Sequence, residues 1–84
     1  MSIQILNCLI VEDEPLAAEI VQSYIEQISF LKLECVCTDA ISAFDLLKQK
    51  RIDVIFLDIH LPKLKGIDFL RSLKIKPKII ITSA

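Results

Sequence analysis

The sequence has 84 residues, 54% of them hydrophobic and 25% charged, and is expected to form one small domain over residues 1–84. Ten basic and eleven acidic residues leave a formal charge of −1, which gives no long-range attraction to nucleic acid or anionic membranes and argues against DNA binding by this segment. The apolar runs fall short of the roughly 18 residues of a membrane span, and no export signal opens the sequence, so a cytoplasmic location is expected.

The first predicted element is a strand over residues 4–11, which is rich in Ile, Leu and Val. Pro15 suits the first position of a following helix, where its missing N–H is not needed. Apolar residues then recur at spacings of three and four, which predicts an amphipathic helix that ends near Ser29 and buries this face. The predicted buried face consists of Ala17, Ile20, Val21, Tyr24, Ile25 and Ile28.

A second strand and helix follow. Residues 33–38 are predicted to form a mixed strand, and Asp39 is well placed to cap the next helix and to interact with its dipole. The apolar stripe of this helix consists of Ala40, Ala43, Phe44 and Leu47, and its basic end of Lys48, Lys50 and Arg51.

The third predicted strand, residues 53–57, is apolar on both faces and therefore belongs in the middle of a sheet. Residues 58–66, which include Pro62 and Gly66, read as a loop. A fourth strand is predicted over residues 79–81. Between the loop and this strand, a short third helix is indicated by Ile67, Phe69, Leu70 and Leu73.

Alternating strands and helices with short connections predict βαβ units, and hence an α/β fold with a doubly wound parallel sheet. Right-handed crossovers restrict the topology to a few strand orders, but periodicity alone leaves the order open. Parallel strands have one firm consequence, since they all present their carboxyl ends at the same edge of the sheet.

Three predicted strands end in polar residues of particular kinds: Glu12 and Asp13 follow the first, Asp58 the third, and Thr82 and Ser83 the fourth. Ligand sites in open α/β sheets lie outside the carboxyl ends of the strands. If the first and third strands are neighbours, about 4.8 Å apart, the carboxylates of Asp13 and Asp58 lie close together, with Glu12 beside them. Such a cluster would raise the pKa of its members or require a cation, and oxygen ligands suit Mg²⁺ or Mn²⁺.

A divalent ion held by few protein oxygens leaves positions for phosphate, which favours phosphoryl chemistry. Asp58 is then the candidate nucleophile, and the Thr82 hydroxyl would contact a phosphoryl oxygen. A structural alternative stays open, because acids after strands also cap helices or accept backbone N–H groups. His60, the single histidine, reads more simply as an exposed loop residue than as a ligand.

The cysteines are Cys8, Cys35 and Cys37, of which the last two share one face of the predicted second strand. We interpret all three as buried small hydrophobic residues. A metal or redox pair is the weaker interpretation, because Cys-x-Cys without further cysteine or histidine neighbours is a poor ligand set.

Three separated motifs resemble the receiver domain of bacterial two-component response regulators: LIVEDEP at residues 9–15, VIFLDIHLPKLKGIDFL at 54–70 and KIIITSA at 78–84. The segments EDEPLA and ITSA most resemble the subgroup attached to LytTR-type DNA-binding outputs. The resemblance covers residues 5–84 and implies a flavodoxin-like sheet with strand order 2-1-3-4. It also implies that Pro62 and Gly66 belong to the loop after the phosphoacceptor.

By the same resemblance, Glu12 and Asp13 match the acidic pair that binds Mg²⁺, and Asp58 matches the phosphoacceptor. His60 matches the position whose backbone carbonyl completes the metal shell, and Thr82 matches the hydroxyl residue that contacts the phosphoryl group. The implied function is transfer of a phosphoryl group from a sensor histidine kinase to Asp58, which switches an output domain. Such a module is a signalling switch and not an enzyme in the usual sense.

The family also has a final helix, strand and helix that the given sequence does not include, and its fifth strand begins with a lysine that pairs with the phosphoryl group. Lys78 would lie at the wrong end of the fourth strand for that role. We therefore expect phosphorylation of the 84-residue segment to be weak or absent. An uncovered fourth strand is a pairing hazard, so the segment is expected to self-associate through that edge or to be part of a longer regulator.

The sequence leaves two other functions to consider. Haloacid-dehalogenase-like phosphatases also form an aspartyl phosphate, but they use Asp-x-Asp after their first strand, whereas Asp58 is followed by Ile59 and His60. A degenerate receiver that binds a partner without phosphorylation is the stronger rival.

Overall fold

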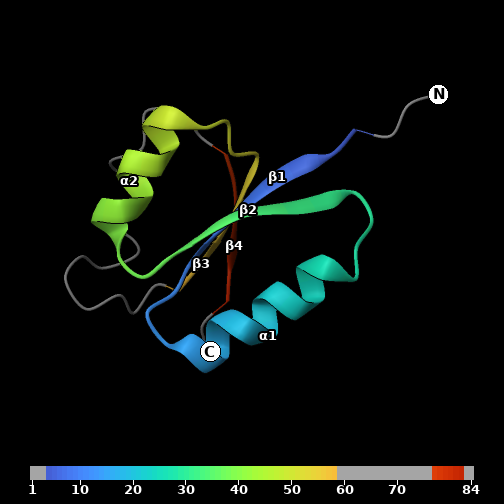
Figure 1. Ribbon diagram of the computed structural model, residues 1–84, viewed down its shortest axis with the longest axis horizontal. Helices are drawn as coiled ribbons and strands as arrows, with labels where there is room; N and C mark the ends of the chain where they lie inside the picture. The colour runs from blue at the N-terminus through green and yellow to red at the C-terminus, as the bar shows by residue number, and fades with distance from the viewer. Residues whose placement is uncertain (1–3, 59–76, 83–84) are drawn as a thin grey trace.

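The computed structural model of the chain describes residues 4–58 and 77–82. Its elements run in the order β1 (Leu6–Val11), α1 (Pro15–Glu26), β2 (Leu31–Cys37), α2 (Ala40–Gln49), β3 (Val54–Leu57) and β4 (Lys78–Ile81) (Figure 1). The predicted third helix lies outside the described residues, as do three loop residues of the sequence analysis, His60, Pro62 and Gly66. No helix of the described segments combines the length and apolarity that a bilayer span requires.

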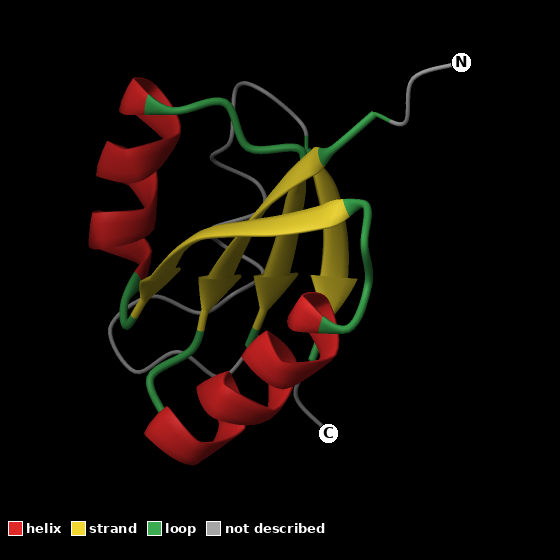
Figure 2. Cartoon of the chain, turned by 45° about the vertical axis from the view of Figure 1, so that its right-hand side comes forward, coloured by secondary structure: helices red, strands yellow, loops and turns green. Residues whose placement is uncertain are grey.

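The four strands form one sheet in the order β2-β1-β3-β4, and all three pairings are parallel. The register pairs Val11 of β1 with Cys37 of β2 and with Leu57 of β3, and Leu57 in turn with Ile81 of β4. All four strands therefore end at one edge, where their arrowheads lie side by side in Figure 2. The parallel α/β fold and the order 2-1-3-4 are confirmed.

The helices cover opposite faces of the sheet (Figure 1), and each face has its own apolar cluster. On the α2 side, Leu9 and Val11 pack with Ala43 and residues of β3. On the α1 side, Cys8 and Ile10 pack with residues of the helix. Because alternate residues of a strand point to opposite faces, β1 buries both of its sides and forms the centre of the fold.

A β-bulge interrupts the pairing of β1 with β2. Cys8 pairs with Leu33 but Leu9 pairs with Cys35, so Glu34 is an extra residue in β2. The bulge reverses the side of the sheet that each later residue of β2 faces. As a result, Leu33 packs into the α1-side cluster, whereas Cys35 and Cys37 pack into the α2-side cluster. The strict alternation assumed in the sequence analysis does not anticipate this shift.

Several predicted boundaries were wrong by one to three residues. Strand β1 begins at Leu6 instead of residue 4, and α1 ends at Glu26 instead of near Ser29. Strand β2 occupies residues 31–37 instead of 33–38, while β3 begins at Val54 and β4 at Lys78. Helix α2 starts as expected, because the Asp39 carboxylate accepts a hydrogen bond of 2.7 Å from the Ser42 N–H. Element ends are set by hydrogen bonds that periodicity does not report.

The predicted buried face of α1 was wrong in part. Ile25 is buried, but Ile20, Tyr24 and Ile28 are 58%, 63% and 36% exposed, and Ala18 is buried instead. At about 100° per residue, Ile20 and Tyr24 lie roughly 150° and 110° around the helix axis from the line of Ala18 and Ile25, which faces the sheet. The apolar stripe of α1 is therefore wider than the strip of helix that the described sheet covers.

All three cysteines are free thiols. Cys8 and Cys37 are buried and Cys35 is half-buried, in agreement with the packing role expected for them. Burial, followed by the neighbouring Cys35, raises the pKa of the Cys37 thiol to about 12.

Candidate metal and phosphoryl site

The backbone hydrogen bonds of the parallel sheet continue one residue beyond the ends of β1, β3 and β4. These bonds fix the position of the first residue after each strand. The bonds are Glu12 N–H to Cys37 O (2.9 Å), Asp58 N–H to Val11 O (3.0 Å) and Thr82 N–H to Leu57 O (3.0 Å). Glu12, Asp58 and Thr82 consequently stand at one level along the carboxyl edge of the sheet. Their positions follow from the strand order, which makes β3 the neighbour of both β1 and β4.

Three carboxylates converge at this edge. One carboxylate oxygen from each of Glu12, Asp13 and Asp58 lies within 4.8 Å of the others. Asp13 is exposed, but Glu12 and Asp58 are only 5% and 7% exposed. The expected approach of Asp13 to Asp58 is therefore found, and its physical reason is the pairing of β1 with β3.

The cluster raises the pKa of Glu12 to about 7. Burial is the largest cause, because desolvation penalises the charged form, and a side-chain hydrogen bond with Asp58 adds to it. The Glu14 N–H donates to Glu12 Oε2 over 3.2 Å and opposes the shift, while the charges of Asp58 and Asp13 reinforce it. Repulsion between the acids was predicted to raise the pKa of a cluster member, and it does contribute for Glu12, but burial contributes more.

This donor set suits a hard divalent cation. It consists only of carboxylate oxygens, two of them buried, and it comes from two adjacent strands. Mg²⁺ and Mn²⁺ prefer oxygen ligands and commonly keep several positions for water or phosphate, which three carboxylates leave available. A cation would also stabilise the ionised form of Glu12, which burial and the neighbouring acids disfavour.

Thr82 and Lys78 mark the two ends of β4. Thr82 is half-buried and follows the strand at the carboxyl edge, on the side of β3 opposite to β1. Lys78 is exposed at the first position of the strand, at the far end of the sheet from the carboxylates, as expected. Ser83 and the backbone carbonyl of His60 lie outside the described residues.

The contribution of Glu14 was not anticipated. The sequence indicated a helix cap, and Glu14 does occupy the N-cap position of α1, but its side chain makes no capping hydrogen bond. Its backbone N–H instead holds the Glu12 carboxylate. The signal available in the sequence was Pro15, which fixes the start of the helix and so brings the Glu14 amide back toward the end of β1.

The profile of the response regulator receiver domain family matches residues 8–84. This chain belongs to that family. The recognition of a receiver domain from three separated motifs is thereby confirmed.

Among its relatives, the chain is similar to the transcriptional regulatory protein MalR of Bacillus subtilis (strain 168), with 36% identity over 82% of this chain and 29% of that protein. It is also similar to protein-glutamate methylesterase/protein-glutamine glutaminase 2 of Shewanella sp. (strain MR-4), with 38% identity over 90% of this chain and 22% of that protein. The chain thus spans less than a third of the length of either relative.

Among solved structures, the MaeR response regulator bound to beryllium trifluoride superposes with a TM-score of 0.86 and 34% sequence identity, covering 95% of this chain and 68% of that one.

The two sequence relatives differ in the activity that their names give. One is named as a transcriptional regulator and the other as an enzyme.

Proposed function

We propose that this receiver domain is a phosphoacceptor switch that takes a phosphoryl group from a sensor histidine kinase onto Asp58, with Mg²⁺ bound by the neighbouring acids. The convergence of Glu12, Asp13 and Asp58 within 4.8 Å is the observation that carries the proposal. Family membership supports it, and by the resemblance of the motifs these three positions match those that bind the metal and the phosphoryl group.

Each side chain has a defined task in this proposal. A carboxylate oxygen of Asp58 attacks phosphorus, the bond from phosphorus to the donor histidine nitrogen breaks, and an acyl phosphate forms. Glu12 and Asp13 would hold the cation together with Asp58 and, by the family resemblance, the His60 carbonyl. When bound, Mg²⁺ would neutralise negative charge on the phosphoryl oxygens. The Thr82 hydroxyl donates to one phosphoryl oxygen.

Metal binding is the first test, because it does not depend on phosphorylation. Mn²⁺ replaces Mg²⁺ at hard oxygen sites, and its unpaired electrons broaden the NMR signals of nearby nuclei. We expect selective broadening at residues 11–13, 58 and 82, with competition by Mg²⁺. Broadening spread over the exposed acids of α1, with residues 12 and 58 unaffected, would instead favour an interaction module without phosphate chemistry.

Phosphorylation is the second test. The 84-residue chain is incubated with acetyl phosphate and Mg²⁺, and Asp58→Asn serves as the control that lacks the nucleophile. We expect slow, substoichiometric modification that is absent in the control, because Lys78, at the start of β4, lies at the far end of the sheet from Asp58. Prompt, stoichiometric modification of Asp58 would show that a lysine is dispensable, and modification of the control would show that the acceptor is another residue.

The wider role is also a proposal. We infer that residues 1–84 belong to one receiver domain whose parent protein regulates transcription through a LytTR-type output, and that the domain itself performs no enzymatic turnover. The similarity to MalR supports a transcriptional output, whereas the similarity to a methylesterase favours another. Because a histidine kinase uses ATP, the phosphoryl transfer to Asp58 would take place in the cytoplasm. The formal charge of −1 favours neither DNA nor a membrane as a direct partner of this domain.

Self-association is proposed through the fourth strand. Strand β4 is at the edge of the described sheet, and Ile80 and Ile81 are exposed. An edge that presents unpaired backbone groups beside apolar side chains favours pairing with a second copy. Light scattering should therefore show dimers or larger species, and Ile80→Lys should shift them toward monomer. A wild-type monomer at high concentration would contradict this.

A further inference from the structure

We propose that Cys35 and Cys37 form a dithiol site that binds a trivalent thiophilic metalloid of the arsenite class in the groove between β2 and α2. The site uses neither the carboxylates nor the chemistry proposed above. It concerns two side chains that we interpreted above as packing residues, with a metal or redox pair as the weaker interpretation, and packing by itself does not account for three observations.

The first observation is the mutual position of the two thiols. They occupy positions i and i+2 of one strand and pack into the same α2-side cluster. The two thiols are close enough for Cys35 to contribute to the raised pKa of the Cys37 thiol, after burial. The hydrogen bond from Cys35 Sγ to the Val36 carbonyl is long at 3.7 Å and weak, so little opposes a small rotation of the thiol. Two neighbouring thiols on one side of a strand are suited to chelation of a single atom after such a rotation.

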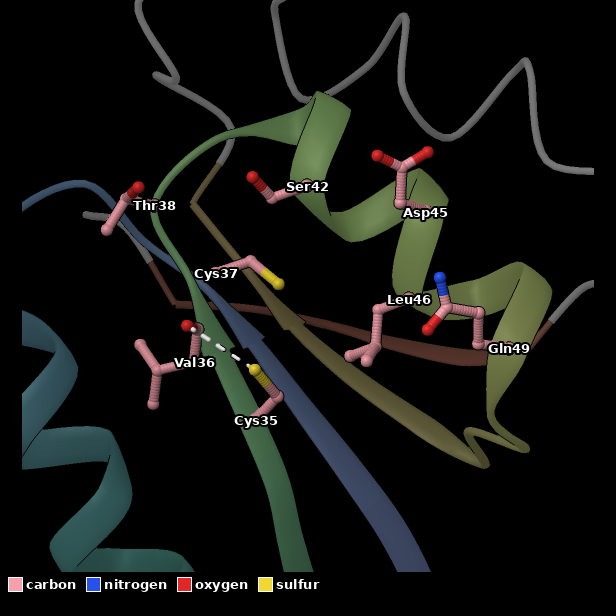
Figure 3. A pocket seen from close by; sticks show the side chains of 8 residues that line it. All are labelled: Cys35, Val36, Cys37, Thr38, Ser42, Asp45, Leu46 and Gln49. Atoms are coloured by element: carbon pink, nitrogen blue, oxygen red, sulfur yellow. Dashed lines mark hydrogen bonds between the residues drawn. The ribbon is translucent and has the colours of Figure 1, made fainter.

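The second observation is the open groove beside them. It has a volume of about 380 Å³, and both cysteines line it from β2. Ser42, Asp45 and Leu46 line it from α2. In Figure 3 the sulfur of Cys37 points toward α2 and Leu46 points back toward β2. Cys35 is half-buried, so a small ligand can enter beside it before it reaches the buried Cys37.

The third observation is the bulge at Glu34. Without the extra residue, the alternation that turns Leu31 and Leu33 to the α1 side would also turn Cys35 and Cys37 there, into the closed cluster under α1. The bulge directs both thiols to the groove instead. Such bulges re-aim side chains and are over-represented beside functional sites.

The number of donors selects the ligand. Zn²⁺ requires four ligands, and within the described residues no group of three or more cysteine, histidine or acidic ligands includes these thiols. Trivalent arsenic that carries one organic substituent needs only two sulfurs. Its bis-thiolate product is neutral, which suits a half-buried site with Asp45 nearby better than a charged complex would.

The binding step is balanced. A group of the form R–As(OH)₂ reacts with two thiols, two As–O bonds break and two As–S bonds form. Each hydroxyl leaves as water with one thiol proton, and arsenic stays trivalent throughout. No oxidant or reductant takes part.

Phenylarsine oxide is the probe, because its hydrate has this form and its phenyl ring can pack against Leu46. We expect intact mass spectrometry of the folded chain to show one adduct that consumes two thiols, and X-ray absorption at the arsenic edge to show two sulfur neighbours. Cys35→Ser and Cys37→Ser should each lower the affinity roughly 10²–10³-fold, since the second bond of a chelate forms at high effective concentration.

Cys8→Ala is the matched control, because Cys8 is a buried thiol on the opposite face of the sheet. It should bind phenylarsine oxide like the wild type. Circular dichroism checks that each variant is folded, and the absorption spectrum of the wild type decides the matter if Cys37→Ser unfolds. An adduct that includes Cys8, one sulfur neighbour instead of two, or no adduct on the folded chain would each overturn the proposal.

Discussion

Acidic residues at the two edges of the sheet have different partners. At the amino edge, the Asp53 carboxylate accepts hydrogen bonds from the Asn7 N–H (2.8 Å) and from Arg51 Nε (3.2 Å). At the carboxyl edge, Glu12 and Asp13 gather around Asp58, and no ion pair between described residues involves either of the first two. The partners described for Asp53 are donors, whereas Glu12, although it accepts the Glu14 N–H, also faces two other carboxylates, and such a group of acids favours a cation.

The amino edge is a closed structural unit. The backbone of Asp53 donates to the Asn7 carbonyl over 2.8 Å and accepts from the Lys78 N–H over 3.0 Å, and the Asn7 side chain donates to the Arg51 carbonyl over 3.2 Å. Asp53 therefore joins the start of β3 to the starts of β1 and β4. Its hydrogen bonds are satisfied within the chain, so nothing there requires a cation.

The largest expected effect is on metal affinity at the carboxyl edge. Asp13→Asn removes a proposed direct ligand, and because loss of even an outer partner costs about 10–100-fold in affinity, we expect at least that loss for Mn²⁺ or Mg²⁺. Titration calorimetry measures it. Asp45→Asn removes the same charge from an exposed position of α2 and should bind the ion normally. Equal affinities of the two variants would contradict the distinction between the edges.

The amino edge should respond in stability instead. Asp53→Ala leaves the Asn7 N–H without its acceptor, and such a loss costs about 1–3 kcal/mol in the free energy of unfolding. Urea denaturation measures this change, and metal affinity of the folded variant should be unaltered. If Asp53→Ala weakened Mn²⁺ binding as strongly as Asp13→Asn, the two edges would not be separable.

The pH dependence of stability sharpens the contrast further. Since the pKa of Glu12 is raised from about 4.5 to about 7 on folding, the folded chain binds more protons than the unfolded chain between these values. The contribution of Glu12 to stability is therefore present below pH 4.5 and is lost as the pH rises to about 7. In metal-free buffer the urea midpoint of the wild type should fall across this window relative to that of Glu12→Gln.

Saturating Mg²⁺ should reduce or reverse this fall, because the ion binds the ionised carboxylates of the folded state. A difference between wild type and Glu12→Gln that stays constant from pH 4.5 to 7 would show that the Glu12 carboxylate is not desolvated in the folded chain.

The smallest effect concerns an acid at the carboxyl edge that serves as a helix cap. Asp39 follows β2 but accepts the Ser42 N–H at 2.7 Å, so it behaves as a helix cap. Asp39→Ala should lower stability by about 1 kcal/mol, and Asp39→Asn, which keeps the acceptor, should have little effect. Urea denaturation compares the two. Equal losses would indicate that charge, and not the capping bond, is what Asp39 contributes.

Much of the fold could be predicted from local patterns. The start of α1 at Pro15, the cap at Asp39 and the central place of the apolar strand β3 are properties of short segments, and all three are found. The row of Ile20 and Tyr24 was misjudged because periodicity reports which residues are apolar, not how wide a strip of helix the sheet covers. The bulge at Glu34 left no local signal, since it depends on the pairing of β2 with β1.

The candidate site divides in the same way. The sequence by itself determined that acids and a hydroxyl residue follow apolar strands at Glu12, Asp13, Asp58 and Thr82, because residue order decides what stands at the end of each strand. Only the tertiary structure decided that β1 and β3 are neighbours, that the carboxylates meet within 4.8 Å, and that burial raises the pKa of Glu12. Strand order and desolvation arise from contacts between distant segments, and these form only when the whole sheet is assembled.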